Sequence, residues 1–83
     1  MKNVTFTYNA IEDGMEGEAC LTLMLEDDRA AKIKAALEYS NTLHKGEAFT
    51  LRHDVNSFCM ACERCRGREY VDESIKTVEI EEV

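Results

Sequence analysis

The chain has 83 residues, of which 45% are hydrophobic and 33% are charged, so it fits one small globular domain (1–83) and not a disordered segment. Its formal net charge of −7 argues against a nucleic-acid partner and against an anionic membrane surface, because proteins bind both through lysine and arginine. No apolar run approaches the roughly 18 residues of a membrane span, and the first residues do not resemble a signal peptide. We therefore expect a small soluble cytoplasmic protein whose four cysteines are thiols or ligands and not disulfides.

Two stretches near the start alternate in the way of half-buried strands. In residues 3–8 the apolar side chains Val4, Phe6 and Tyr8 share one side, and in residues 18–25 leucines face inward while Cys20 faces the opposite way. Residues 9–17 between them are polar and hold two glycines. They predict a hairpin loop longer than the minimal two-residue turn.

A first helix is expected from a cap at Asp27 or Asp28 to about Lys45. Gly46 suits the left-handed residue after its last turn. Asp28 stands four residues before Lys32, a favourable pairing, and Lys45 together with its neighbour in the last turn would offset the helix dipole. That neighbour of Lys45 is His44. The apolar stripe of the helix is formed by Ala30, Ile33, Leu37 and either Ser40 or Leu43.

Residues 47–67 allow two interpretations. Phe49 and Leu51 could form a short strand before a second helix, or Thr50 could cap one longer helix. The longer helix is slightly favoured because Leu51, Val55, Phe58 and the later cysteines recur at helical spacing. In both cases Gly67 ends the helix.

The last strand is expected at about 74–82, where Val78 and Ile80 alternate with acidic residues. These elements predict an α+β fold, with a small sheet of three strands and two helices packed on one face. The order is ββααβ. If the strand at Phe49 forms, the sheet has four strands and the order is ββαβαβ.

Cys59, Cys62 and Cys65 form the cluster that bears most on chemistry. Thiolates at such spacing bind zinc, with Cys20 or His53 as a fourth ligand. On one straight helix, however, successive members of the cluster are turned by about 60°, so the three thiols do not converge on one ion.

Free cysteine also packs as a small hydrophobic residue, and this interpretation is favoured for Cys59 and Cys62. A redox role is the third alternative, since Cys59 and Cys62 have Cys-x-x-Cys spacing. The chain has no proline, so it lacks the cis-proline that faces the disulfide in thioredoxin-like proteins. We therefore predict no metal and no cofactor, with zinc at Cys59, Cys62, Cys65 and Cys20 or His53 as the alternative.

The charged clusters predict surface roles. Arg64, Arg66 and Arg68 near the end of the second helix are interpreted as cations that offset its dipole, with an anion site as the alternative. Acidic residues gather in two places and could present a negative surface to a basic protein, although simple solvation explains them too. They are Glu12, Asp13, Glu16 and Glu18 near the hairpin tip, and Glu79, Glu81 and Glu82 at the end.

No nucleophile has a base and an orienting acid that can be identified in the sequence, and four glycines are too few for a phosphate-binding loop. We therefore expect no enzyme activity and no catalytic residues. The favoured function is a noncatalytic protein-binding or regulatory module that uses its sheet surface or its acidic loop. The alternative is a zinc-binding domain. The sequence does not indicate the oligomeric state.

Overall fold

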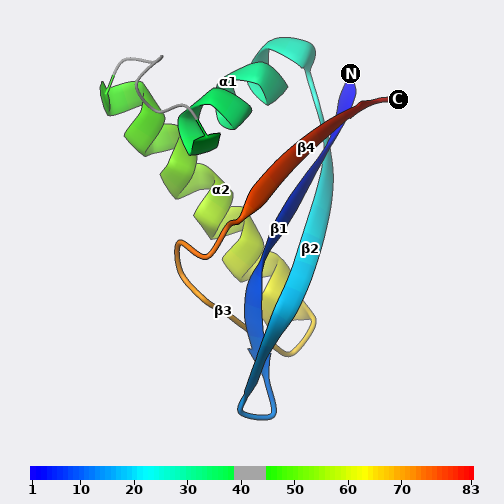
Figure 1. The fold of residues 1–83 in the computed structure, drawn as a ribbon, viewed down its shortest axis with the longest axis vertical. Helices are drawn as coiled ribbons and strands as arrows, with labels where there is room; N and C mark the ends of the chain where they lie inside the picture. Colours follow the sequence, from blue (N-terminus) through cyan, green and yellow to red (C-terminus); the bar gives the residue numbers. More distant parts are fainter. Residues whose placement is uncertain (39–44) are drawn as a thin grey trace.

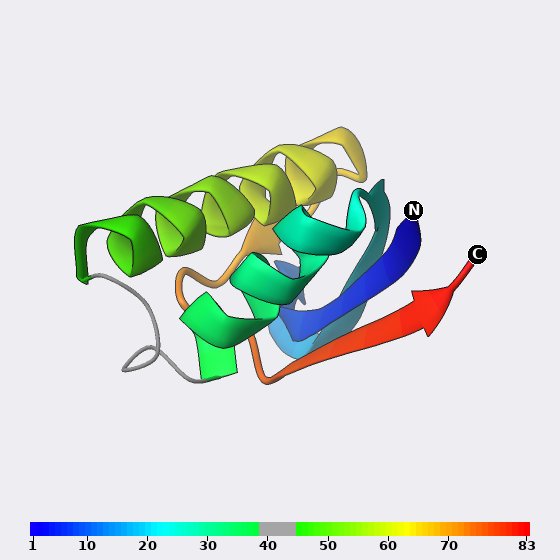
Figure 2. The ribbon, with the colours of Figure 1, turned by 90° about the horizontal axis from the view of Figure 1, so that it is seen from above.

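The structure is a computed structural model that describes residues 1–38 and 45–83. Its described elements are two strands, two helices and two further strands (Figure 1). The α+β class and the packing of both helices on one face of the sheet agree with the prediction (Figure 2). The order ββααββ differs from both predicted orders, because a two-residue strand follows the second helix. The bounds are β1 Lys2–Glu12, β2 Met15–Leu25, α1 Asp27–Glu38, α2 Lys45–Cys65, β3 Glu69–Tyr70 and β4 Thr77–Glu82.

Strand β1 is the centre of an antiparallel sheet. It pairs with β2 along its whole length, and on its other side with β4 and then β3. In the register of these pairings, Thr7 lies opposite Cys20 of β2 and Thr77 of β4. The even-numbered residues of β1 from Val4 to Ala10 point to the helices and are buried, whereas the odd-numbered ones are only partly buried on the helix-free face. The strand alternation predicted for residues 3–8 is therefore correct.

The hairpin turn is tighter than predicted. Glu12 pairs with Met15, so only Asp13 and Gly14 form the turn. Both have positive φ angles, 53° for Asp13 and 77° for Gly14. This is the type I′ geometry whose right-handed twist matches that of the two strands, and Asp-Gly is one of its preferred sequences. The prediction of a longer loop over 9–17 was wrong, because Asp13 and Gly14 alone form a two-residue turn and the polar residues on either side continue the two strands.

Helix α1 is shorter than the predicted span, since it ends at Glu38. Ser40, Leu43 and His44 lie outside the described residues. Lys45 and Gly46 belong to the start of α2, so neither ends α1 as predicted. Two side-chain predictions also need correction. Lys32 pairs with Glu47 at 3.2 Å and not with Asp28, and Leu37 is only partly buried, while Ala36 takes the core position.

Helix α2 confirms the longer of the two alternatives, although it begins at Lys45 and not at Thr50. Residues 47–52 are helical and Phe49 is exposed, so the alternative short strand is wrong. Gly67 ends the helix as predicted, with a φ of 75°. The main-chain N–H of Arg68 bonds to the carbonyl of Glu63 at 2.8 Å, and that of Gly67 bonds to Arg64 at 3.1 Å. This pair of bonds is a Schellman motif.

The last strand begins at Thr77, three residues later than predicted. The residues before it form a connection that is bonded to its neighbours. Ser74 Oγ accepts a hydrogen bond from the main-chain N–H of Asn9 at 2.9 Å, and Asn56 Oδ1 of α2 accepts one from Glu73 at 3.1 Å. The connection therefore joins β1 to α2 and does not continue β4.

The core lies between the sheet and the two helices. Tyr8 of β1 and Tyr70 of β3 meet edge to face, with ring centroids 5.2 Å apart. Neither α1 nor α2, over the residues described, is both long and apolar enough to cross a membrane. The core is formed by the buried side chains of Val4, Phe6, Tyr8, Ala30, Ile33, Ala36, Leu51, Val55, Cys59, Tyr70 and Val78.

Candidate functional site

One charged side chain is fully buried within the described part of the chain, and it is Glu63 of α2. Its Oε1 accepts hydrogen bonds from Tyr8 Oη at 2.6 Å, from Arg66 Nη1 at 2.9 Å and from Arg68 Nη2 at 3.1 Å. Its Oε2 accepts one from Arg68 Nε at 2.6 Å. Helix α2, its C-terminal turn and the central strand therefore meet at this one carboxylate.

The partners of Glu63 decide its ionisation. Burial alone would raise the pKa of this carboxyl, but the hydrogen bonds from Tyr8 and Arg68 and the charges of Arg68 and Arg66 lower the pKa below its usual value. Burial, and then the bond to Glu63, raises the pKa of Tyr8. Glu63 therefore stays ionised and Tyr8 stays neutral at neutral pH. A carboxylate that is already saturated with donors is a structural ion-pair centre and a poor proton acceptor.

The spacing of buried residues along α2 points to this cluster in the sequence itself. Leu51, Val55, Cys59 and Glu63 recur every four residues, so a glutamate continues the buried row of α2. A glutamate in that position needs cations, and Arg66 follows at helical spacing. The interpretation of the arginines as dipole cations is thus incomplete, because Arg66 and Arg68 bind the buried carboxylate. Arg64 is exposed.

The structure separates the residues that the alternative zinc site would use. Cys59 is buried in the core, Cys62 is partly buried and Cys65 is exposed. Cys20 is exposed, and its strand parity places it on the helix-free face of the sheet, opposite to the face that Cys59 packs against. Over residues 1–38 and 45–83, no group of three or more potential ligands is positioned to hold a metal ion. His53 is exposed on α2.

Cys59 has the environment of a packed hydrophobic residue. Burial, with added repulsion from Cys62 and Glu63, raises the pKa of the Cys59 thiol to about 12. A thiol of this kind is neutral near pH 7 and is a weak nucleophile. The core interpretation of Cys59 therefore agrees with its position.

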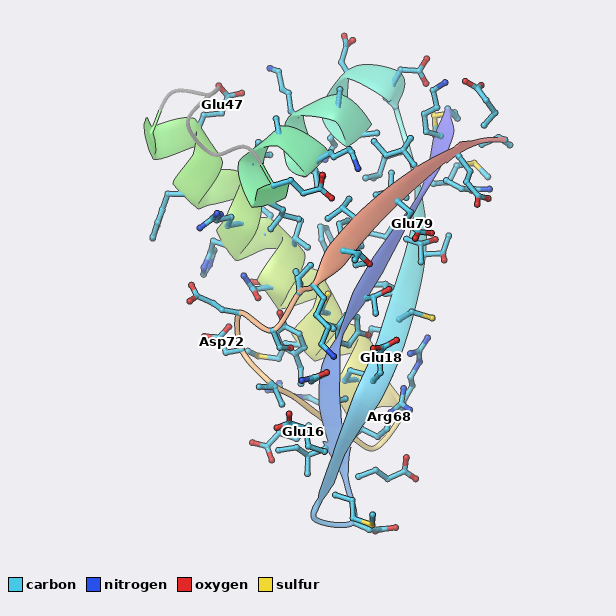
Figure 3. The ribbon with its side chains drawn as sticks, in the orientation of Figure 1. Glu16, Glu18, Glu47, Arg68, Asp72 and Glu79 are labelled. Carbon is cyan, nitrogen blue, oxygen red and sulfur yellow. The ribbon has the colours of Figure 1, made fainter. Side chains whose placement is uncertain are left out.

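The acidic residues near the hairpin spread along the strands and are exposed. Glu16 accepts a hydrogen bond from Asn9 Nδ2 at 3.0 Å, and Glu18 pairs with Lys76 at 3.4 Å, both on the helix-free face. Figure 3 shows Glu18 beside β2 and Glu79 beside β4. The second acidic set is exposed on β4, where Glu82 pairs with Lys2.

Strand β2 has the longest outer edge of the described sheet, since it has 11 residues against six in β4 and two in β3. The carbonyls of Thr7 and Asn9 in β1 accept hydrogen bonds from the main-chain N–H groups of Lys76 at 2.7 Å and Val71 at 3.0 Å. The main-chain N–H and C=O groups of the odd-numbered residues of β1 therefore point in the plane of the sheet toward β3 and β4. Their partners in β2, such as Cys20 opposite Thr7, therefore direct their own N–H and C=O groups away from β1. No other described strand lies on that side of β2. The residues with outward main-chain groups are Glu16, Glu18, Cys20, Thr22 and Met24.

The helices leave this strand partly uncovered. Helix α1 packs against β4 and β1, and α2 packs against β3. In Figure 1, β2 lies on the side of the sheet away from both helix labels. Leu21, Leu23 and Leu25 face the helix side, but they are only partly buried. The described outer edge of β2 thus combines main-chain groups that have no strand partner with accessible leucines.

The comparisons with known proteins add no assignment. No protein-family model matches this chain, and neither the curated proteins nor the solved structures include a significant match to it.

Proposed function

We propose that this domain is a noncatalytic protein-binding module that takes up an extended segment of a partner along the outer edge of β2. The supporting observation is an 11-residue strand whose outward N–H and C=O groups have no strand partner among the described residues. An extended peptide adds to such an edge by main-chain hydrogen bonds, while its side chains supply the specificity. The helix-free face of the sheet and the acidic tip of the hairpin lie next to this edge.

The side chains of β2 restrict what a partner can present. On the helix side, Leu21, Leu23 and Leu25 favour apolar partner residues, because an uncovered leucine gains from losing contact with water. On the opposite side, Glu16 and Glu18 favour basic or neutral residues, because like charges in directly opposed positions destabilise strand pairing. A fitting segment is therefore apolar on one face and basic or neutral on the other.

The four thiols are free in the structure, which supports a protein of a reducing compartment. We therefore also propose the cytoplasm as its location, with no metal or cofactor needed for binding. The −7 net charge supports a protein partner over a nucleic acid.

The test removes one outward donor. Thr22→Pro deletes a main-chain N–H that faces away from β1, at a position where an edge strand tolerates proline. Thr22→Val is the matched control, because it loses the hydroxyl that contacts Thr5 at 2.9 Å but keeps the N–H. Circular dichroism and thermal unfolding establish that both variants fold.

The binding probe is a peptide selected from a displayed library of random 12-residue sequences. We expect selected peptides to alternate apolar with basic or neutral residues. Their affinity, measured by fluorescence anisotropy, should fall at least about tenfold for folded Thr22→Pro and stay within about twofold for Thr22→Val. The proposal is wrong if no peptide is selected, or if those selected bind Thr22→Pro as well as the unaltered protein.

A further inference from the structure

We infer that the extended segment is strand β2 of a second copy of this chain, paired antiparallel about a two-fold axis at Cys20. This inference rests on the proposed function of the β2 edge. Cys20 is the middle residue of Met15–Leu25, so the full-length antiparallel register places Cys20 opposite Cys20 of the second copy. The resulting dimer has one continuous sheet.

The main-chain groups fit this register. Cys20, Thr22 and Met24 direct their N–H and C=O groups outward, and so do Glu18 and Glu16. In the full-length register Thr22 lies opposite Glu18 of the second copy, and Met24 lies opposite Glu16. Each outward group therefore meets an outward group, as hydrogen-bonded antiparallel pairs require.

The two halves of β2 differ on the helix-free face, and the two-fold axis brings unlike halves together. The first half carries Glu16 and Glu18, whereas the second half carries the neutral Thr22 and Met24. Each glutamate thus lies opposite a neutral residue, and no two carboxylates are directly opposed. A parallel arrangement in register would instead place each glutamate beside the same glutamate of the second copy.

The helix side shows the same complementarity in size. Gly17 and Ala19 are small, and with Arg68 they line a shallow depression of about 190 Å³ beside the first half of β2. Figure 3 shows Arg68 beside this half of the strand. In the full-length register Leu21 and Leu23 of the second copy lie opposite Ala19 and Gly17. The partly exposed leucines of one copy therefore meet the small residues of the other.

Two features oppose the pairing and are built into the test. Each copy carries a net charge of −7, so the dimer should strengthen as salt screens the repulsion. Arg66 Nη1 lies 3.0 Å from the Cys20 carbonyl oxygen and must leave it when the second copy binds. It keeps its bond of 2.9 Å to Glu63.

The first measurement is sedimentation of the full chain under reducing conditions. The protein concentration runs from about 10 µM to about 1 mM, at low and at high salt. We expect a concentration-dependent dimer whose dissociation constant falls with added salt. Thr22→Pro should raise the dissociation constant at least about tenfold, while Thr22→Val should change it about twofold or less. A monomer at all concentrations, or a dimer that Thr22→Pro leaves unchanged, overturns the inference.

Disulfide trapping tests the axis itself. With Cys62 and Cys65 replaced by serine, oxidised glutathione should link two copies through Cys20, because facing Cα atoms of a hydrogen-bonded pair are about 5.5 Å apart. The matched control is Glu18→Cys with Cys20→Ser. Residue 18 of one copy lies opposite residue 22 of the other, so the two introduced thiols are about 13 Å apart along the strand and should not link.

A dimer that links through the control cysteine but not through Cys20 overturns the inferred register. The outcome also separates the two proposals. If the chain stays monomeric while selected peptides still depend on the Thr22 N–H, the second copy is excluded and the binding edge stands. If neither is observed, both proposals are wrong.

Discussion

Arg66 of α2 donates a hydrogen bond to the main-chain carbonyl of Cys20 at 3.0 Å, at the middle of the outer edge of β2. Lys34 of α1 does the same to the carbonyl of Val78 on β4, at 2.7 Å. Strands β2 and β4 thus each have one outward carbonyl covered by a cation, from α1 in the case of β4 and from the end of α2 in the case of β2. Charged side chains at sheet edges oppose uncontrolled strand pairing. On the 11-residue β2, one such contact leaves most of the edge open.

Replacing Glu63 by glutamine should destabilise the fold. The glutamine amide would present a donor to arginines that require an acceptor, and their charges would lose their buried partner. Removing one member of a buried ion pair costs about 3–5 kcal/mol, and we expect a value near 3 because both arginines reach solvent. Urea unfolding measures the change. Glu79→Gln is the control with the same charge change at an exposed site, and should lie within about 0.5 kcal/mol of the unaltered protein.

The same carboxylate should make stability depend on pH. The pKa of Glu63 is lower in the folded protein than the value of about 4.3 in the unfolded chain. Its contribution is therefore complete above about pH 4.3 and is lost as pH falls through the folded pKa. The free energy of unfolding should fall less steeply for Glu63→Gln than for the unaltered protein between about pH 5 and pH 3. Parallel pH profiles of the two proteins would contradict the assignment.

Local patterns predicted the parts of the fold that depend on a single element. The alternation of Val4, Phe6 and Tyr8 identified a strand and its buried face, and Gly67 identified the end of α2. The two-residue strand β3 was missed because Glu69 and Tyr70 form it by pairing with β1, and no alternation is visible in two residues. Short strands of this kind are defined by their neighbours.

The centre of the site was missed for a related reason. Glu63 was not predicted as a site residue, although it continues the buried row of Val55 and Cys59. Its hydrogen bond to Tyr8 joins residues 55 positions apart, so local spacing could not reveal it. The open edge of β2 also follows from pairing alone, since the sequence does not state on which side of β1 the later strands lie.

The turn geometry predicts different effects for two glycines of the same hairpin. Gly14 has a φ of 77°, whereas Gly17 lies within β2 and is not in the left-handed region. A Cβ atom added at either glycine meets no atom within 4 Å, so steric contact does not distinguish them. Gly14→Ala should therefore cost about 1–2 kcal/mol through backbone strain. Gly17→Ala should be close to neutral, and equal losses in urea unfolding would contradict the type I′ turn.

The core of α1 predicts a contrast between two large residues one turn apart. Ile33 is almost fully buried, so Ile33→Ala should cost about 2–5 kcal/mol. Leu37 was expected to be buried as well, but part of its surface is already in water. Leu37→Ala should therefore cost less, about 1–2 kcal/mol. Thermal and urea unfolding of the two variants would show the difference, and a larger loss at Leu37 would contradict the packing of α1.

The four thiols should react in an order set by their burial. Cys20 and Cys65 are exposed, so a thiol reagent at pH 8 should modify them first, and the partly buried Cys62 should follow more slowly. Cys59 should react only when the protein unfolds, because it is enclosed in the core and burial raises its pKa to about 12. Alkylation followed by mass spectrometry of the peptides assigns each rate to its residue, and urea supplies the unfolded reference.

The alternative zinc site makes the opposite prediction. One zinc per chain in elemental analysis, with Cys62 and Cys65 protected until a chelator is added, would show that the cysteines bind metal. Labelling of Cys59 as fast as Cys65 in the folded protein would show that the helix row of Val55 and Cys59 is not buried.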